Sequence, residues 1–510
     1  MSVKNNKNKS PLSNLRGFGI YITAGSLLLS ACAKTFTSSS DTLLGQPSSS
    51  GFWQTANDAT SAVNSIYGNL RVWDNTAFPA IAVESMGSDD VTKGSVSSDA
   101  SYLFEYDNFT IDPSESQLES FYQGQYQNIN FCNQVLDHVD TMASVDASLK
   151  ARYLAEAKFV RAWSYFRLER AFGNVPLVLH VPLTPAEQNP AQSTPTQIWA
   201  AIEQDLTDAA SVLPATYGPA DVGRATKGAA LALHAKVAMY QKNWADVVTY
   251  TNQVTALGVY SLFPDYYQMF RFANENCSES IFEIQCDYVP GNADINSSQY
   301  SQVQGDRDVT VPGSVGWGFN VPTQNLVSEF EAGDPRLTGT VMMQGTTTPS
   351  GDPVPMAAAG APTMYCMKSY VPFAIAAQNP NQGCAQNVRM IRYADVLLMN
   401  AEANNETGNT AAALASLEMV RARARAKSTN PATDLPAVTT TDQGALRTAI
   451  YHERRVELAM EYDRYFDVIR QGRASTVFGP LGWTAKNTYW PIPQNEIDIS
   501  GGKLIQNSGY

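Results

Sequence analysis

Apolar positions recur at helical spacing along much of the chain. Between residues 151 and 170, aromatic and aliphatic side chains are interleaved with Arg, Lys and Glu, which predicts an amphipathic helix. Gly173 and Pro176 follow directly and supply its terminator. The same spacing predicts a long last helix over about residues 442–470, and residues 280–285 alternate as one short strand would.

Two stretches repeat one plan, in which an alanine-rich helix, a polar turn and a second helix follow one another. They are residues 226–254 and 392–425. The same interval of twelve residues separates matching small or β-branched positions, Ala235 to Val247 and Ala401 to Ala413. Small residues at such positions let paired helices approach closely, as in tetratricopeptide units. We therefore predict a mainly α fold built from tetratricopeptide-like helix pairs, with a few short strands.

Three long segments of another character interrupt the helices. Residues 87–106, 289–322 and 344–387 are rich in Gly, Pro, Ser, Asn and Thr and carry scattered aromatic residues. Loops of this length within a compact domain are usually functional or disordered. The pattern predicts a helical scaffold that carries a loop-rich, ligand-binding part.

The first 31 residues form a separate segment. Four basic residues without an acid precede a short apolar stretch over residues 17–31, which is typical of a secretory signal. Leu29-Ser30-Ala31-Cys32 resembles the lipobox of bacterial lipoproteins, so we expect Cys32 to be lipidated and to become the mature N-terminus. The alternative is a plain signal peptide with a chance cysteine. Residues 32–50 are rich in serine and are predicted to form a flexible tether.

Composition narrows the class of protein. The chain has 510 residues, of which 44% are apolar and 16% charged, enough for one large domain or two closely packed lobes. A balance of 35 basic to 48 acidic residues disfavours nucleic acid as a partner, because phosphate binding needs a concentrated basic face. We expect no cofactor and no metal, since the four histidines are scattered and lie in no metal-binding or catalytic motif.

Five cysteines remain after Cys32, an odd number for an exported chain. Cys366 and Cys384 are the favoured disulfide because both lie in one long loop. Cys277 and Cys286 are the competing pair.

Five sequence blocks, in order, resemble the SusD/RagB family of outer-membrane lipoproteins of Bacteroidota. They cover residues 155–163 with 173–177, residues 334–337, residues 392–403, residues 453–467 and residues 491–510. The last block ends in Gln-Asn-Ser-Gly-Tyr, where the family usually has Pro in place of Ser508. Surface lipoproteins of that phylum often carry acids after the lipidated cysteine, whereas this chain has Ala33-Lys34-Thr35.

The resemblance implies a binding protein with no catalytic residues. Such proteins face outward on the outer membrane, cap a SusC-like TonB-dependent transporter and capture oligosaccharides or, in the RagB branch, peptides. It also implies one compact unit with an N-terminal part over residues 51–218 and a C-terminal part over residues 219–510. A surface glycoside hydrolase remains the enzymatic alternative, and it would need two carboxylates beside the sugar bond. Because the chain has 48 acidic residues, some such pair can always be suggested, so the sequence says little about this alternative.

Sugar binding requires aromatic faces for the C–H side of a pyranose ring and polar neighbours for its hydroxyls. Trp163 and Trp490 lie in helical or Pro-rich context and are expected in the core. The predicted ligand-binding set comes from the loops and comprises Trp73, Asp89, Asp90, Tyr300, Trp317 and Asn320. The charged residues Arg454, Arg455, Glu457, Glu461, Arg464 and Asp467 are instead expected to pair along one helix as structural support.

Overall fold

The computed structural model describes residues 51–287, 297–307, 316–354, 356, 360–376 and 385–510. All of them belong to one compact unit. The predicted signal segment 1–31, Cys32, the tether 32–50 and Cys384 lie outside the described residues.

Helices dominate the described residues. The longer ones are α1 (Ala56–Leu70), α5 (Ser116–Val139), α6 (Ala147–Phe172), α7 (Pro195–Val212), α8 (Lys227–Tyr240), α9 (Trp244–Ala256), α15 (Tyr393–Glu406), α16 (Thr410–Arg425) and α17 (Gln443–Leu458). The shorter ones are α2 (Trp73–Thr76), α3 (Phe78–Ile81), α4 (Phe104–Asp107), α10 (Tyr266–Met269), α11 (Tyr300–Gln304), α12 (Gln324–Glu329), α13 (Arg336–Thr340), α14 (Phe373–Ala376), α18 (Arg464–Arg470), α19 (Ala474–Val477) and α20 (Gln494–Ile499). A π-helical turn, η1 (Ala82–Met86), follows α3, and 3-10 turns occupy η2 (Ser101–Leu103), η3 (Pro219–Asp221), η4 (Phe272–Asn274), η5 (Gly479–Leu481) and η6 (Ala485–Thr488).

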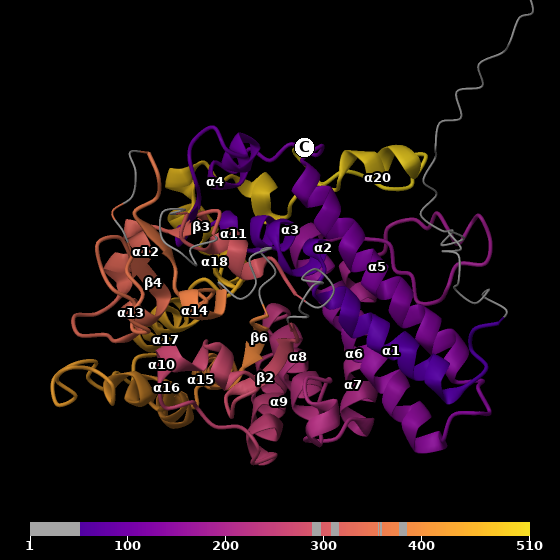
Figure 1. The fold of residues 1–510 in the computed structure, drawn as a ribbon, viewed down its shortest axis with the longest axis horizontal. Coiled ribbons are helices and arrows are strands. Elements are labelled where there is room, and N and C mark those ends of the chain that lie inside the picture. The colour runs from indigo at the N-terminus through magenta and orange to yellow at the C-terminus, as the bar shows by residue number, and fades with distance from the viewer. Residues whose placement is uncertain (1–50, 288–296, 308–315, 355, 357–359, 377–384) are drawn as a thin grey trace, which may run out of the picture. The chain divides into compact units, whose positions relative to one another are not determined.

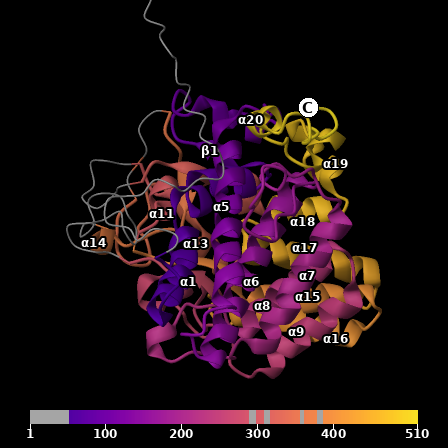
Figure 2. The same cartoon turned by 90° about the vertical axis from the view of Figure 1, so that its right-hand side faces the viewer.

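The predicted helix pairs are confirmed. The stretch 226–254 forms α8 and α9, and the stretch 392–425 forms α15 and α16. The helices from α5 to α9 pack each against the next, and α15 then joins α9 to α16 and α17. In Figures 1 and 2, α1, α5 and α6 run side by side. Alanines in α8 and α15 are fully buried, so close approach of the helices explains the small residues of the repeat.

The prediction of one helix over residues 442–470 is wrong. The chain forms α17 and α18, separated by a break in which Met460 and Tyr462 have φ angles of 66° and 69°. Both side chains are buried, and the Tyr462 hydroxyl donates a hydrogen bond to the Thr76 carbonyl at 3.2 Å. Tertiary burial of these two side chains therefore outweighs the local helical preference.

The expected charge lattice along that helix is also wrong for most of its members. Arg455 and Arg464 pair with Asp89, and Glu461 pairs with Arg392 and Lys368, so these contacts join distant segments. Arg454 bridges Asp395 of α15 and Asp467 of α18. The charges hold separate elements together and do not support a single helix.

The described strands form three two-stranded antiparallel sheets. They are β1 (Val91–Gly94) with β3 (Phe319–Pro322), β2 (Ser280–Ile284) with β6 (Val388–Arg392), and β4 (Val341–Met343) with β5 (Met364–Cys366). The strand predicted over residues 280–285 is thus confirmed. In the first sheet Gly94 lies opposite Phe319, which brings the loops around residues 73–106 and 317–322 together.

The C-terminal residues 489–510 close over the end of α6. The Trp490 amide donates to the Ala171 carbonyl at 2.8 Å, and the Asn507 amide group donates to the Phe172 carbonyl at 3.0 Å. The Trp490 indole is fully buried. These contacts define a C-terminal clasp, residues 489–510, which contains the last of the five sequence blocks.

Candidate functional site

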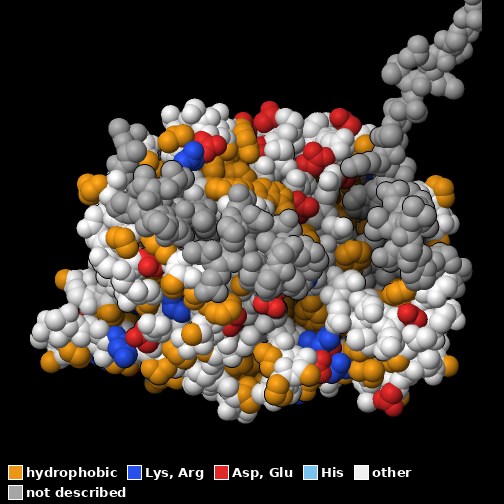
Figure 3. Space-filling model, in the orientation of Figure 1, with side chains coloured by type: hydrophobic (Ala, Val, Ile, Leu, Met, Phe, Trp, Pro, Cys, Tyr) orange, Lys and Arg blue, Asp and Glu red, His pale blue; other side chains and the backbone are white. Residues whose placement is uncertain are grey.

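Two of the predicted residues, Trp73 and Trp317, lie next to each other. Their ring centroids are 6.1 Å apart and the planes are inclined by 56°. Trp73 begins α2 and Trp317 lies two residues before β3, so residues 244 positions apart in the sequence form one aromatic pair. Both indoles are only partly buried. Hydrophobic side chains gather on this face over α3, next to α2 (Figure 3).

The aromatic pair rests on a second layer of rings. Phe78 lies 5.8 Å from Trp73 and 6.5 Å from Trp317, and its ring meets Phe319 edge to face at 4.8 Å. Beneath Phe319 is the buried ammonium group of Lys93, 5.3 Å from the ring centroid. Such contacts fix the orientation of the rings, so the upper faces of the two indoles are presented in one geometry.

Polar groups stand beside the pair. The Arg307 guanidinium donates to the Trp317 carbonyl at 3.3 Å and also contacts Asp99 and Ser95. The side chains of Arg307 and Asp99 are 34% and 38% exposed, so both retain capacity for a ligand. Exposed donors and acceptors next to two indoles are the combination that carbohydrate recognition needs.

A buried amide network holds α2 in place. The Asn75 side chain is fully buried, donates to the Asn69 carbonyl at 2.7 Å and accepts from Gln125 at 2.8 Å. Gly124 of α5 lies against this turn, where a Cβ atom would stand 2.7 Å from the Asp74 Cβ. Ordinary carbon contacts are about 3.5–4.0 Å, so the absence of a side chain at Gly124 lets α2 sit on α5.

Replacing Gly124 with alanine is expected to displace α2 and change the angle of the aromatic pair. Two indoles at this distance and angle couple electronically and give a couplet in the circular-dichroism spectrum. The part of the spectrum that disappears in Trp73→Phe identifies this couplet, and it should also weaken in Gly124→Ala. The double variant Gly124→Ala/Asp74→Gly removes the clashing Cβ and should restore it. Gly68→Ala in α1 is the matched control, because its Cβ would meet nothing closer than 3.8 Å. An unchanged couplet in Gly124→Ala would show that Gly124 does not determine the angle between the two indoles.

Comparison with known proteins gives the family. Residues 278–510 match the family model described as the SusD family, and residues 46–239 match the model described as starch-binding associating with outer membrane. The chain belongs to the SusD/RagB family.

Its relatives extend over nearly the whole chain. A SusD-like protein of Formosa agariphila, P2, is 27% identical over 90% of this chain and 94% of its own length. A laminarin-binding SusD-like protein of known structure is 28% identical, covers 90% of this chain and all of its own, and superposes with a TM-score of 0.75. Surface glycan-binding protein A of Bacteroides thetaiotaomicron, solved with laminarihexaose, has the same TM-score at 22% identity and coverage of 89% and 100%, which bears on the fold.

Asp89 and Asp90 were predicted to bind ligand, but the structure engages both carboxylates within the protein. Asp89 accepts two hydrogen bonds of 2.8 Å from Arg464, and Asp90 accepts one of 2.8 Å from Arg455. Asp90 is 1% exposed. The reason is that the sequence block containing Arg455 and Arg464 packs against the Ser-Asp-Asp loop, so both carboxylates stabilise the fold.

Tyr300 and Asn320 are also placed differently from the expectation. Tyr300 is buried on α11 with its ring 6.0 Å from Tyr462. Asn320 is buried in β3 at a φ of 52°, and its amide group donates to the Gln304 side chain at 2.8 Å. Both residues support the loops around the aromatic pair and do not face its exposed side.

Among the described residues, Cys132, Cys277 and Cys366 carry free thiols. The competing pair Cys277 and Cys286 is therefore not bridged. Cys366 is fully buried in β5, and its predicted partner Cys384 lies outside the described residues.

Within the described part of the chain, no group of three His, Cys, Asp or Glu side chains is placed to hold a metal ion. Within the same residues, no helix is long and apolar enough to cross a bilayer. Burial raises the pKa of Glu169 to about 8, but this carboxyl group lies in α6 near Tyr489 of the C-terminal clasp. This carboxyl group is part of the packing between α6 and the C-terminal clasp.

Sequence reasoning missed Phe78, Arg307 and Asp99, which complete the site. Phe78 is a ring five residues after Trp73 and could have been included on that ground. Arg307 and Asp99 carry no sequence signal, because their contact depends on the pairing of β1 with β3, more than 200 residues apart.

Proposed function

We propose that this SusD-family protein is a cell-surface nutrient-binding lipoprotein. It captures an oligosaccharide at the aromatic pair Trp73 and Trp317 and passes it to a SusC-like TonB-dependent transporter. The observation that carries the proposal is the pair itself, two inclined and partly exposed indoles. The partly exposed Arg307 guanidinium stands beside them and pairs with Asp99. The similarity to a laminarin-binding SusD-like protein supports a glycan as the ligand class. The transporter comes from the family alone.

The binding site is tested with Trp73→Ala. Stacking of a ring on an indole contributes about 0.5–1.5 kcal/mol beyond the buried area, so the affinity for a bound glycan should fall several-fold or more. The melting temperature should barely change, because Trp73 is partly exposed. Calorimetric titration with laminarin oligosaccharides and other glycans, run beside thermal melts, measures both quantities.

Trp244→Ala is the matched control, a partly exposed tryptophan on α9 that should leave affinity unchanged. An unaltered affinity in Trp73→Ala would remove the aromatic pair from the binding site. Binding of peptides in place of every glycan would favour the RagB-type alternative, in which backbone hydrogen bonds and pockets select the ligand. Release of reducing ends from glycans would favour the glycoside hydrolase.

The lipid anchor is tested with Cys32→Ser. Thioether lipidation needs the cysteine sulfur, so the variant should appear in the soluble fraction or remain unprocessed. Membrane fractionation of cells producing the parent and the variant measures this. A variant that stays fully bound to the outer membrane would overturn the lipobox assignment and leave the plain signal peptide.

A further inference from the structure

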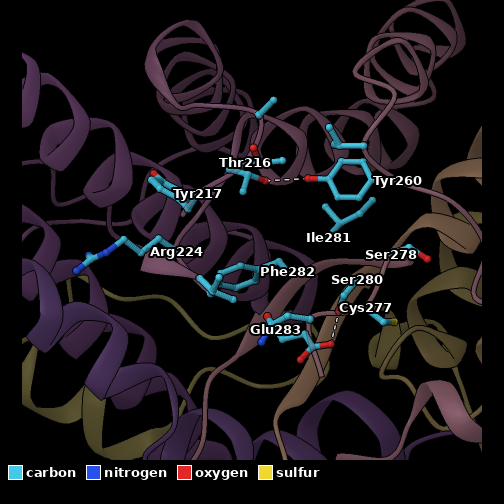
Figure 4. Close-up of a pocket in the computed structure, with 16 residues that line it drawn as sticks. Thr216, Tyr217, Arg224, Tyr260, Cys277, Ser278, Ser280, Ile281, Phe282 and Glu283 are labelled. Atoms are coloured by element: carbon cyan, nitrogen blue, oxygen red, sulfur yellow. Dashed lines mark hydrogen bonds between the residues drawn. The ribbon is translucent and has the colours of Figure 1, made fainter. Parts of the chain in front are cut away.

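A cavity of about 210 Å³ lies apart from the aromatic pair, on other elements of the fold. Its walls come from the connection between α7 and α8, the start of the connection after α9, and β2 with the residues before it (Figure 4). The proposed glycan site uses α2, β1 and β3 and shares no residue with it. Ligand pockets for drug-sized molecules are about 300–1,000 Å³, so this cavity suits a single small ring.

The apolar walls of the cavity are held in place by their own contacts. The Tyr260 hydroxyl is hydrogen-bonded to Thr226 Oγ1 at 3.0 Å, and this bond is the dashed line at Tyr260 in Figure 4. Phe282 meets Phe159 edge to face with ring centroids 5.0 Å apart. The walls are therefore preformed, and little ordering is needed when a ligand enters.

The charged groups at the cavity are already compensated. Arg224 donates to Glu156 at 3.0 Å and to Asp221 at 2.7 Å. Glu283 accepts a hydrogen bond of 2.9 Å from Asn387 and lies 3.5 Å from Arg389. An ionic ligand would meet no free counter-charge among these groups, so the lining favours a neutral one.

The remaining lining groups are mostly hydroxyls between apolar walls. The hydroxyls come from Thr216, Tyr217, Thr226, Tyr260, Ser278 and Ser280, and Asn276 adds an amide. Ser278 donates to the Ser261 carbonyl and Ser280 to Glu283, so these two hydroxyls offer a ligand their acceptor lone pairs. Neutral hydroxyl groups beside a ring and aliphatic carbons match a molecule with one apolar face and several hydroxyls. We propose that this cavity is a second carbohydrate site, which takes one neutral pyranose ring. It does not depend on glycan binding at the aromatic pair.

Cys277 offers a direct measure of occupancy, because its thiol is free and lines the cavity. Burial raises the pKa of this thiol, so its reaction with N-ethylmaleimide at neutral pH is slow enough to time. Cys286 is partly exposed and does not line the cavity, so it serves as the internal reference. The folded protein is alkylated, the reaction is quenched at set times, and mass spectrometry of the digested peptides resolves the two rates.

D-glucose and laminaribiose should slow alkylation of Cys277 at least five-fold at saturation and leave Cys286 unchanged. Tyr260→Phe removes one wall hydroxyl and should weaken this protection about three- to ten-fold, the range expected for one hydrogen bond. Trp73→Ala should leave the protection unchanged, which separates this site from the proposed function. Tyr250→Phe on α9, outside the cavity, is the matched control.

Several results would overturn the proposal. They are no protection by any neutral sugar, equal protection by free amino acids, and protection that survives intact in Tyr260→Phe. Loss of protection in Trp73→Ala would also overturn it, since sugar would then act through the aromatic pair.

Discussion

Replacing Glu457 with glutamine is expected to lower the free energy of unfolding by about 3–5 kcal/mol, the cost of removing one partner from a buried ion pair. Glu457 is fully buried and contacts three arginines: Arg392 at 2.6 Å, Arg336 at 3.0 Å and Arg423. These arginines come from β6, α13 and α16, so one carboxylate joins three distant elements to α17. Without its charge the guanidinium groups remain buried and undercompensated.

Arg447→Gln is the matched control, on the same helix. Arg447 pairs with Glu406 at 2.5 Å, but its side chain is 35% exposed. Exposed pairs contribute about 0–1 kcal/mol, so this variant should unfold almost as the parent does. Urea unfolding of both variants measures the difference. Equal losses in the two would show that the buried network is not what holds the elements together.

The same network predicts a pH dependence. Burial alone would raise the pKa of Glu457, but Arg423, Arg392 and Arg336 outweigh it and hold the pKa well below the usual range. The pKa of Glu461 is likewise lowered against burial by Arg392 and Lys368. A carboxylate with a lowered folded pKa stabilises the fold above its unfolded pKa of about 4.3, and this stability is lost as the pH falls. As the pH falls below about 4.3, toward the lowered pKa of the folded state, Glu457→Gln should therefore lose less stability than the parent.

The helix pairs could be predicted from the sequence because their signal is local. Alanines at regular positions in residues 226–254 and 392–425 mark close helix contacts, and the structure has α8, α9, α15 and α16 there. The break between α17 and α18 could not be predicted in this way. It depends on burial of Met460 and Tyr462 by segments remote in sequence, including Thr76.

The residues of the candidate site could likewise be predicted from the sequence only in part. The aromatic character and loop position of Trp73 and Trp317 were sufficient to single them out, and the structure brings them together. The local sequence signal for Asp89 and Asp90 was equally strong, because both are polar residues in a Gly- and Ser-rich loop. Their partners Arg455 and Arg464 lie more than 360 residues away, so only the tertiary structure reveals that both carboxylates are consumed in ion pairs.

Replacing Trp490 with alanine is expected to destabilise the fold by about 3–5 kcal/mol, the cost of truncating a large buried aromatic side chain. The indole stacks on Tyr465 with ring centroids 4.4 Å apart, and its N–H donates to the Val83 carbonyl at 2.9 Å. It also fills the space beside Gly87, where a Cβ would lie 2.7 Å from the indole. One side chain therefore fastens the C-terminal clasp to η1 and α18.

The matched control is Trp483→Ala, seven residues earlier and partly exposed, which should cost clearly less. Thermal and urea unfolding compare the two, and limited proteolysis followed by mass spectrometry locates the effect. If the clasp is fastened by Trp490, the variant should be cut first within residues 489–510, before the helix pairs open. Equal losses of stability in the two variants, with no earlier cleavage within residues 489–510, would contradict this. The hydrogen bonds from the Trp490 backbone N–H and the Asn507 side chain to carbonyls at the end of α6 would then hold the clasp without the indole.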